Sequence, residues 1–289
     1  MSNTRPDSST LIQGLTGPAG PLVLIAGPCV LESSDLNNRI AERMKAICES
    51  LGITYVFKAS FDKANRSSIT SPRGPGLDEG LRLLESIKNE HDLPLCTDIH
   101  EPSQAAAVGE VVDILQIPAF LCRQTDLLVE AGRTDCLVNV KKGQFMAAIE
   151  MKNVVKKLEE AGASGIMLTE RGTFFGYHRL VNDFIGVGDM MDLGCPVCFD
   201  ITHSTQLPGG TGTMSGGRKE RCELLARAAV AIGIPCLFME CHPDPDNAAS
   251  DKNTVMPLDG MESILASLVT IRNTILGLPQ LQPGDNHAD

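Results

Sequence analysis

Eleven residues from Lys58 to Ser68 gather several anion-binding side chains directly after an apolar run. The run over residues 53–57 predicts a buried strand, and Lys58, Lys63 and Arg66 follow it among small polar side chains. Point charges, a guanidinium fork, hydroxyls and backbone N–H groups together suit the oxygens of a phosphate group. A solvated loop could also hold such charges, but it would not need so many of them at the end of a strand. The segment therefore predicts a site for a phosphorylated substrate.

Four other residues offer the kinds of ligand that hold a catalytic metal ion. They supply a thiol, an imidazole and two carboxylates, from Cys29, His203, Glu240 and Asp251. Mixed sulfur, nitrogen and oxygen ligation suits Zn²⁺, Fe²⁺ or Mn²⁺. The four are scattered along the chain, so their spacing alone is a weak argument. A lone histidine such as His203 is more often a hydrogen-bonded core residue than a ligand.

The elements that must position these residues repeat one pattern, an apolar strand followed by a helical stretch. Strands are expected at about residues 22–27, 53–58, 94–99, 112–117, 136–141, 165–169, 196–201 and 235–240. Apolar positions with a helical period lie between them, for example at 35–50, 77–90, 144–161 and 217–232. Continuous apolar strands alternating with helices indicate a parallel sheet covered by helices. Eight such units predict one α/β domain of 289 residues, a single (β/α)₈ barrel.

The two ends of the chain differ from this pattern. The first 20 residues, which include Gly14, Gly17 and Gly20, predict a short hairpin that plugs the bottom of the barrel. Residues 279–289 are expected to form a loose tail.

Reactive or charged residues follow every expected strand. In a barrel of this kind, the active site lies at the carboxyl ends of the strands. Those ends carry Cys29, Lys58, Asp98 with His100, Gln116, Lys141 with Lys142, Glu170 with Arg171, Asp200 with His203, and Glu240 with His242. Any one of these could be a solvated strand end, but their joint occurrence indicates a site. A cationic set within an acidic chain favours small polyanionic substrates, and its members are Lys58, Lys63, Arg66, Lys141 and Arg171.

The overall composition argues against several classes of protein. A net charge of −11 argues against binding to nucleic acid or to a membrane surface. No apolar run approaches the roughly 18–20 residues of a membrane span, and the first residues lack the pattern of a signal peptide. Of the ten cysteines, Cys96, Cys198 and Cys236 lie within strand-like runs, where cysteine behaves as a small hydrophobic residue. Free thiols suit a reducing cytoplasm.

Two further motifs carry weaker signals. Cys195 and Cys198 form a CxxC pattern, but it straddles the start of a strand, which disfavours a redox pair. The Gly-rich segment from Gly209 to Gly217 suits a mobile lid better than a phosphate loop, because it lacks the Gly-Lys-Ser/Thr ending of a nucleotide-binding loop. Contacts within residues 206–219 are not assigned from the sequence.

Several longer strings resemble one family of enzymes. Residues 25–33 (IAGPCVLES) resemble the first-strand motif of the aldol synthases that condense phosphoenolpyruvate, and residues 63–68 (KANRSS) narrow this to the 3-deoxy-D-manno-octulosonate 8-phosphate synthases. Further similar strings lie at 116–126, 139–142, 171–177, 199–203 and 240–245, and the resemblance covers about residues 22–275. It implies a (β/α)₈ barrel, usually a homotetramer. It also implies the joining of phosphoenolpyruvate to arabinose 5-phosphate with release of phosphate, in the synthesis of the lipopolysaccharide sugar KDO.

The resemblance also assigns roles to residues of this chain. Contacts with phosphoenolpyruvate fall on Lys58, Lys63, Gln116, Ala119, Lys141 and Arg171, and Ser60 joins this substrate-binding set. Contacts with arabinose 5-phosphate fall on Asn65, Arg66 and Ser67, of which Arg66 and Ser67 reach the site of a neighbouring subunit.

The same resemblance bears on the metal and on proton transfer. Cys29 stands where metal-independent members have Asn, so the chain resembles the metal-dependent class, with Cys29, His203, Glu240 and Asp251 as ligands of Zn²⁺, Fe²⁺ or Mn²⁺. Many relatives have Gly after the aspartate, whereas this chain has Lys252. Candidates for proton transfer are Lys63, Asp98, His203 and Glu240.

Three alternative functions can be compared with this one. The 3-deoxy-arabino-heptulosonate 7-phosphate synthases use erythrose 4-phosphate, and they usually place Pro-Arg where this chain has Asn65-Arg66. A non-catalytic metal sensor on a degenerate barrel would have lost some strand-end charges, yet all are present. A structural zinc protein would need closely spaced cysteine pairs, but the cysteines here are dispersed.

Overall fold

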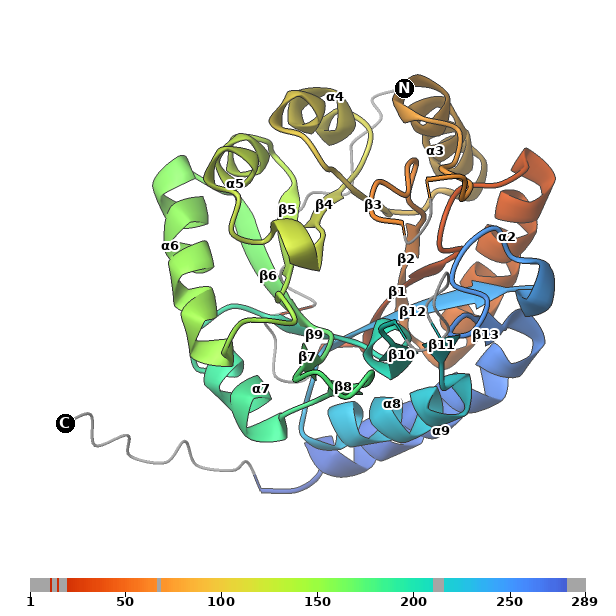
Figure 1. Cartoon of the computed structure of the whole chain (residues 1–289). Helices are drawn as coiled ribbons and strands as arrows, with labels where there is room; N and C mark the ends of the chain where they lie inside the picture. Colours follow the sequence, from red (N-terminus) through yellow and green to blue (C-terminus); the bar gives the residue numbers. More distant parts are fainter. Residues whose placement is uncertain (1–10, 12–14, 16–19, 67–68, 210–215, 280–289) are drawn as a thin grey trace.

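Eight parallel strands close into a barrel at the centre of the molecule (Figure 1). The computed structural model describes residues 11, 15, 20–66, 69–209 and 216–279. Each barrel strand pairs in parallel with its neighbours, and β1 pairs with β12 to close the ring. The barrel strands are Val23–Gly27 (β1), Thr54–Lys58 (β2), Leu95–Asp98 (β3), Ile114–Ile117 (β4), Leu137–Lys141 (β5), Gly165–Glu170 (β6), Val197–Asp200 (β9) and Cys236–His242 (β12). The predicted barrel and its eight strands are confirmed.

A ring of helices surrounds the strands, one after each (Figure 1). Helix α2 shows how the sequence sets such a helix. Ser33 accepts a hydrogen bond from the Leu36 N–H at its start, and Gly52 ends it with a left-handed φ of 66°, which glycine adopts easily. The helices are Ser34–Leu51 (α2), Leu77–His91 (α3), Ala105–Gly109 (α4), Thr125–Gly132 (α5), Lys152–Ala161 (α6), Phe184–Met191 (α7), Cys222–Ala231 (α8) and Met261–Leu276 (α9).

Two predicted helices begin later than expected. The helix expected from Gln144 begins at Lys152, after a 3₁₀ turn at Ala148–Met151, because Gln144 and Met146 are buried in the preceding loop, where the Met146 carbonyl accepts from Lys142. The helix expected from Gly217 begins at Cys222, because Gly216 and Gly217 pair with another segment as a strand. In both places the loop after a barrel strand includes residues that the spacing of apolar positions alone would assign to a helix.

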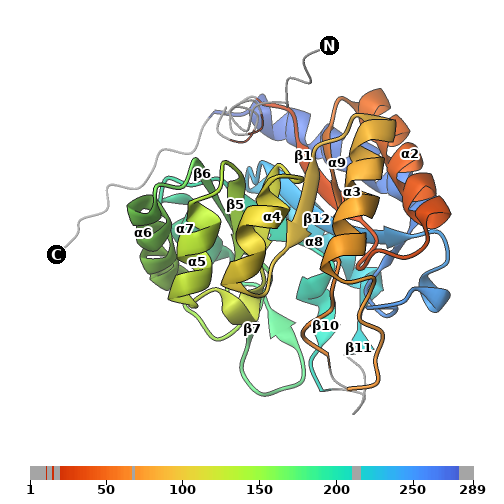
Figure 2. The same ribbon diagram turned by 90° about the horizontal axis from the view of Figure 1, so that it is seen from above.

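Short elements complete the barrel rim. Two antiparallel ribbons extend from one end of the barrel, one from Thr173–Phe174 (β7) and Leu180–Val181 (β8), the other from Gln206–Leu207 (β10) and Gly216–Gly217 (β11) (Figure 2). Met256–Pro257 (β13) pairs with the end of β12. The 3₁₀ turns are Pro102–Gln104, Ala119–Leu121, Ala148–Met151, His203–Thr205, Lys219–Arg221, Pro245–Asn247 and Leu258–Gly260.

The barrel interior is filled by side chains, which makes it a packed core. Its fully buried members are Val23, Ile25, Val56, Cys96, Ile114, Leu137, Met167, Cys198, Cys236 and Phe238, and Leu11 and Leu15 pack against them. Leu11 and Leu15 both have helical backbone conformation, and the predicted hairpin is not confirmed. The rest of that segment, and the tail expected at 279–289 except for residue 279, lie outside the described residues.

All ten cysteines are free thiols, including both members of the CxxC pattern. Cys198 points into the barrel core, whereas Cys195 precedes the strand and is only partly buried. Across the described part of the chain, no helix combines the length and the hydropathy that a membrane span requires.

Candidate active site at the carboxyl ends of the strands

The ends of β1 and β2 meet closely, and this brings Cys29 next to Lys58. A Cβ atom on Gly27 would lie 2.1 Å from the Lys58 carbonyl oxygen, so only glycine permits this approach. Beyond the strands, Val30 forms a bridge with Ser60, and the Lys58 ammonium lies 3.5 Å from the Cys29 carbonyl oxygen. The first-strand motif and the first residues of the cationic segment therefore form one wall of the rim.

Three of the four predicted metal ligands come together on this side of the rim. One donor atom from each of Cys29, Glu240 and Asp251 lies within 4.8 Å of the others. The Cys29 thiol donates to Asp251 Oδ2 at 3.0 Å. Both carboxylate oxygens of Glu240 are buried without a hydrogen-bond partner among the described residues, which is costly for a charged group. The Lys58 ammonium lies 3.8 Å from Glu240 Oε1. A soft donor and two carboxylates, one of which accepts no hydrogen bond from the described residues, fit a divalent cation.

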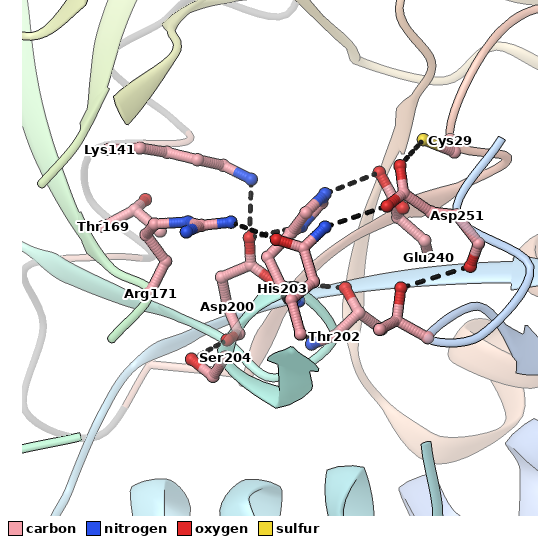
Figure 3. A network of polar contacts seen from close by, with 12 residues as sticks. Cys29, Lys141, Thr169, Arg171, Asp200, Thr202, His203, Ser204, Glu240 and Asp251 are labelled. Carbon is pink, nitrogen blue, oxygen red and sulfur yellow. Dashed lines mark hydrogen bonds and ion pairs between the residues drawn. The ribbon is translucent and has the colours of Figure 1, made fainter. Parts of the chain in front are cut away.

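His203 lies beside this group, held by Asp200. Its Nδ1 lies 2.7 Å from Asp200 Oδ2, and its Nε2 lies 3.6 Å from Glu240 Oε1 (Figure 3). Asp200 Oδ1 also accepts the backbone N–H of His203 at 2.9 Å. A carboxylate that accepts a hydrogen bond from Nδ1–H leaves Nε2 available to a cation, the usual arrangement of metal-binding histidines. The Nε2 atom of His203 therefore faces Glu240, although His203 lies outside the group of three donors within 4.8 Å.

The electrostatics of the thiol and the carboxylate depend on each other. Burial, together with Asp251 and Glu240, raises the pKa of the Cys29 thiol well above its ordinary value. Burial also opposes ionisation of Asp251, but Lys63 and His203 outweigh it and hold the pKa of that carboxyl well below its ordinary value. The Lys63 ammonium lies 3.9 Å from Asp251 Oδ2. A divalent cation at this place would favour the Cys29 thiolate, since metal ligation requires deprotonation.

Buried cations form the opposite side of the rim (Figure 3). The Lys141 ammonium lies 2.6 Å from Asp200 Oδ2 and 3.5 Å from the centre of the Phe238 ring. Arg171 is 6% exposed, and burial lowers the pKa of its guanidinium. Its Nη1 is buried without a hydrogen-bond partner among the described residues. Such a group suits the oxygens of an anionic ligand.

A second chain of contacts holds Lys58 in place. Lys58 donates to Ser60 Oγ at 2.9 Å, and Ser60 Oγ donates to Asp98 Oδ1 at 2.5 Å. The other Asp98 oxygen lies 3.0 Å from His100 Nε2. Burial opposes ionisation of Asp98, but Lys58 and His100 outweigh it and hold the pKa of the carboxyl well below its ordinary value. Burial likewise disfavours the Lys58 ammonium, yet Asp98 and Glu240 raise its pKa.

The other predicted substrate residues lie at different depths. Gln116 is buried at the end of β4 and accepts from Asn139 Nδ2 at 3.4 Å, while Ala119 is buried at the start of the next 3₁₀ turn. Asn65 is exposed, and Arg66 Nη1 donates to the Lys63 carbonyl within its own loop. Arg66 Nε is buried without a partner in the described chain, and Ser67 lies outside the described residues. Within one chain, therefore, no contact described for Arg66 reaches the metal ligands.

Gln206 is the site residue that the sequence analysis left unassigned. Its amide joins the two sides of the rim, accepting from Arg171 Nη2 at 2.8 Å and donating to Asp251 Oδ1 at 2.8 Å. Its position three residues after His203 and three residues before the Gly-rich segment was the available signal.

The barrel, its cationic rim and its cluster of metal-type ligands define an enzyme for small phosphorylated substrates, and comparison with known proteins agrees. Residues 4–276 match the model of the DAHP synthetase I family. Three relatives named 2-dehydro-3-deoxyphosphooctonate aldolase come from Synechococcus sp., Syntrophotalea carbinolica and Geobacter sulfurreducens. They are 55%, 50% and 53% identical to this chain, over 90%, 94% and 87% of it and 91%, 98% and 92% of their own lengths.

The chain belongs to the DAHP synthetase I family and, within it, to the 2-dehydro-3-deoxyphosphooctonate aldolases. This name denotes the same enzyme as 3-deoxy-D-manno-octulosonate 8-phosphate synthase, so the resemblance to that family found in the sequence is confirmed.

Proposed function

We propose that this protein condenses phosphoenolpyruvate with arabinose 5-phosphate and water to give 3-deoxy-D-manno-octulosonate 8-phosphate and phosphate, in KDO biosynthesis. The observation that carries the proposal is the high identity to relatives named for this aldolase, over nearly the full length of both chains. The geometry supports it, because one rim presents buried cations for two phosphorylated substrates next to a cluster of metal-type ligands.

The reaction needs two anions to approach each other in a fixed orientation. C3 of phosphoenolpyruvate attacks the aldehyde carbon of the sugar, water adds at C2, and phosphate leaves as the C2–O bond breaks. Lys58, Lys141 and Arg171 are buried and anchored, so they can hold the phosphoenolpyruvate anion without moving. Such positioning lowers the entropy cost of bringing the reactants together in the reaction step, and the positive charges offset the repulsion between the two anions. Gln116, Ala119 and Ser60 complete this half of the proposed site.

Proton transfer falls to groups next to the reacting atoms. Lys63 has a pKa well above its ordinary value, because Cys29, Glu240 and Asp251 outweigh the opposing effect of burial. Its ammonium therefore stays charged and can donate a hydrogen bond to the aldehyde oxygen, stabilising the negative charge that develops there. Asp98, His203 and Glu240 are the candidates for accepting the proton that the attacking water loses.

The metal is part of the proposal. Cys29, His203, Glu240 and Asp251 would hold Zn²⁺, Fe²⁺ or Mn²⁺, and the ion would supply Lewis acidity to orient the aldehyde, its hydroxyl neighbour or the water. The Glu240 oxygens, which accept no hydrogen bond from the described residues, and the Asp200-oriented ring of His203 support this assignment.

The sugar phosphate is proposed to bind through Asn65, Arg66 and Ser67, with Arg66 and Ser67 serving a neighbouring subunit of a homotetramer. The loop from Lys63 to Pro75 supports this, because it is far longer than the roughly 2–6 residues of a usual βα connection. The buried, unpartnered Nε of Arg66 also leaves a donor for a ligand. The free state of all ten cysteines supports a cytoplasmic location.

A paired substrate assay tests the proposed reaction. Phosphate release from phosphoenolpyruvate is followed with arabinose 5-phosphate and, separately, with erythrose 4-phosphate. The alternative reaction of the family, heptulosonate phosphate synthesis, uses the shorter sugar. We expect kcat/KM to favour arabinose 5-phosphate by orders of magnitude, since a site built to hydrogen-bond a substrate rejects analogues that leave its polar groups unpaired. Equal values for the two sugars would assign the chain to the alternative.

A further inference from the structure

Gln206 connects the two halves of the candidate site through its side-chain amide. The carbonyl oxygen accepts from Arg171 Nη2 at 2.8 Å, and the nitrogen donates to Asp251 Oδ1 at 2.8 Å. These residues come from the end of β6, from β10 and from the loop that follows β12. Figure 3 shows Arg171 on one side of His203 and Asp251 on the other. One amide therefore contacts both a proposed anion-binding group and a proposed metal ligand.

The other polar atom of each partner lies next to further groups of the candidate site. With Oδ1 of Asp251 occupied by Gln206, Oδ2 faces the Cys29 thiol at 3.0 Å and the Lys63 ammonium at 3.9 Å. With Nη2 of Arg171 occupied by Gln206, the buried Nη1 has no hydrogen-bond partner in the described chain. The amide thus orients each group so that its other polar atom faces the candidate site.

We infer that Gln206 is a positioning residue that couples metal binding to phosphoenolpyruvate binding. A ligand on either side fixes the amide, so the second ligand meets a partner that is already ordered and loses less conformational entropy on binding. Such coupling is reciprocal, and typical values change affinity by about 5–150-fold. The inference rests on the proposed function, because it needs both ligands to bind at this rim.

Isothermal titration calorimetry on the full chain measures this coupling. Mn²⁺ is titrated into metal-free protein with and without saturating phosphoenolpyruvate, and the ratio of the two Kd values is the coupling factor. For the unmodified protein we expect Mn²⁺ to bind about fivefold or more tightly when phosphoenolpyruvate is present. Gln206→Met keeps the length of the side chain but loses both hydrogen bonds, and it should bring the ratio close to the residual value set by direct attraction between the two ligands. Gln206→Ala serves as a second variant should the first not fold.

A matched control separates coupling from ordinary support of the metal site. Ser250 Oγ donates to Asp251 Oδ2 at 3.0 Å, and the contacts described for it include none with Arg171. Ser250→Ala should weaken Mn²⁺ binding while leaving the coupling factor unchanged. The inference is overturned if the unmodified protein shows no coupling, or if Gln206→Met retains the full ratio. Failure of either ligand to bind the unmodified protein would instead overturn the proposed function.

Discussion

Asp200 holds the imidazole of His203 through a contact of 2.7 Å between Oδ2 and Nδ1. The same carboxylate oxygen lies 2.6 Å from the Lys141 ammonium, so one buried aspartate positions a proposed metal ligand and a proposed substrate ligand. Burial opposes ionisation of Asp200, yet His203 and Lys141 hold its pKa well below the ordinary value.

Replacement of Asp200 should therefore weaken metal binding although Asp200 is not itself a ligand. Asp200→Asn keeps the shape of the side chain but removes the charge that orients His203, and we expect metal affinity to fall by roughly 10–100-fold. Competition with a chelator of known affinity measures this loss. Asp192→Asn, at an exposed position just after α7, is the control. An unchanged affinity in Asp200→Asn would show that His203 does not depend on this contact.

Stability should depend on pH through Asp98 and Asp200. Both have folded-state pKa values well below the ordinary value of 3.8. Their stabilising contribution is therefore fully present above the unfolded pKa of about 4, and it is lost as pH falls from there through the folded value. Asp98→Asn removes the nearer of the two carboxylates that pair with Lys58, at 3.5 Å against 3.8 Å for Glu240, and should cost about 3 kcal/mol of unfolding free energy at pH 7.

Urea denaturation of the metal-free protein at pH 7, 5 and 3.5 measures this effect. The difference between Asp98→Asn and the unmodified chain should be similar at the two higher values and smaller at the lowest. Glu85→Gln, at an exposed position in α3, controls for loss of one carboxylate and should change little. A difference that stays constant down to pH 3.5 would argue against a lowered pKa of Asp98 in the folded state.

Glu32 should set the position of the loop that carries Asp251. Its Oε1 accepts the Ala249 N–H at 3.1 Å and lies 3.3 Å from His242 Nε2, while Asp251 itself has a left-handed φ of 51°. Glu32→Ala releases this loop, and we expect metal affinity to fall by roughly 10–100-fold. Glu32→Gln keeps the acceptor and should retain most of the affinity. Equal loss in both variants would mean that the charge of Glu32 matters more than its hydrogen bond.

The proposed sharing of sites between subunits can be tested by mixing inactive variants. Arg66→Ala and Arg171→Ala should each be nearly inactive, because the first loses a contact with arabinose 5-phosphate and the second loses a contact with phosphoenolpyruvate. If Arg66 serves a neighbour, exchange of subunits rebuilds some intact sites and phosphate release rises above either parent. Mass spectrometry confirms that subunits have exchanged. A mixture that exchanges but stays inactive would place Arg66 in the site of its own chain.

The barrel could be predicted because its signals are local. Strands buried on both faces are continuous apolar runs, and the helices between them show a regular period. The errors lie where a loop uses residues that also suit a helix, as at Gln144 and Gly217. The N-terminal hairpin is not confirmed, and glycine spacing, which suggests turns, does not show how Leu11 and Leu15 pack.

The candidate site was predictable in its residue types but not in its contacts. Strand ends in a barrel share one rim, so Cys29 and Glu240 could be grouped from the sequence. The bridge made by Gln206 and the support of His203 by Asp200 depend on side-chain directions across distant strands, and no local pattern encodes these.

The need for a metal at Cys29 is the central claim, and one measurement tests it most directly. Phosphate release from phosphoenolpyruvate and arabinose 5-phosphate is followed with protein shown by elemental analysis to be metal-free, before and after addition of Mn²⁺. We expect no turnover before Mn²⁺ is added and full turnover at one ion per chain. The control is Cys195→Ser, at a partly buried cysteine that precedes β9, and this variant should behave like the unmodified protein. Cys29→Asn should show weak activity that chelators do not remove. Full turnover by the unmodified, metal-free protein would contradict the account.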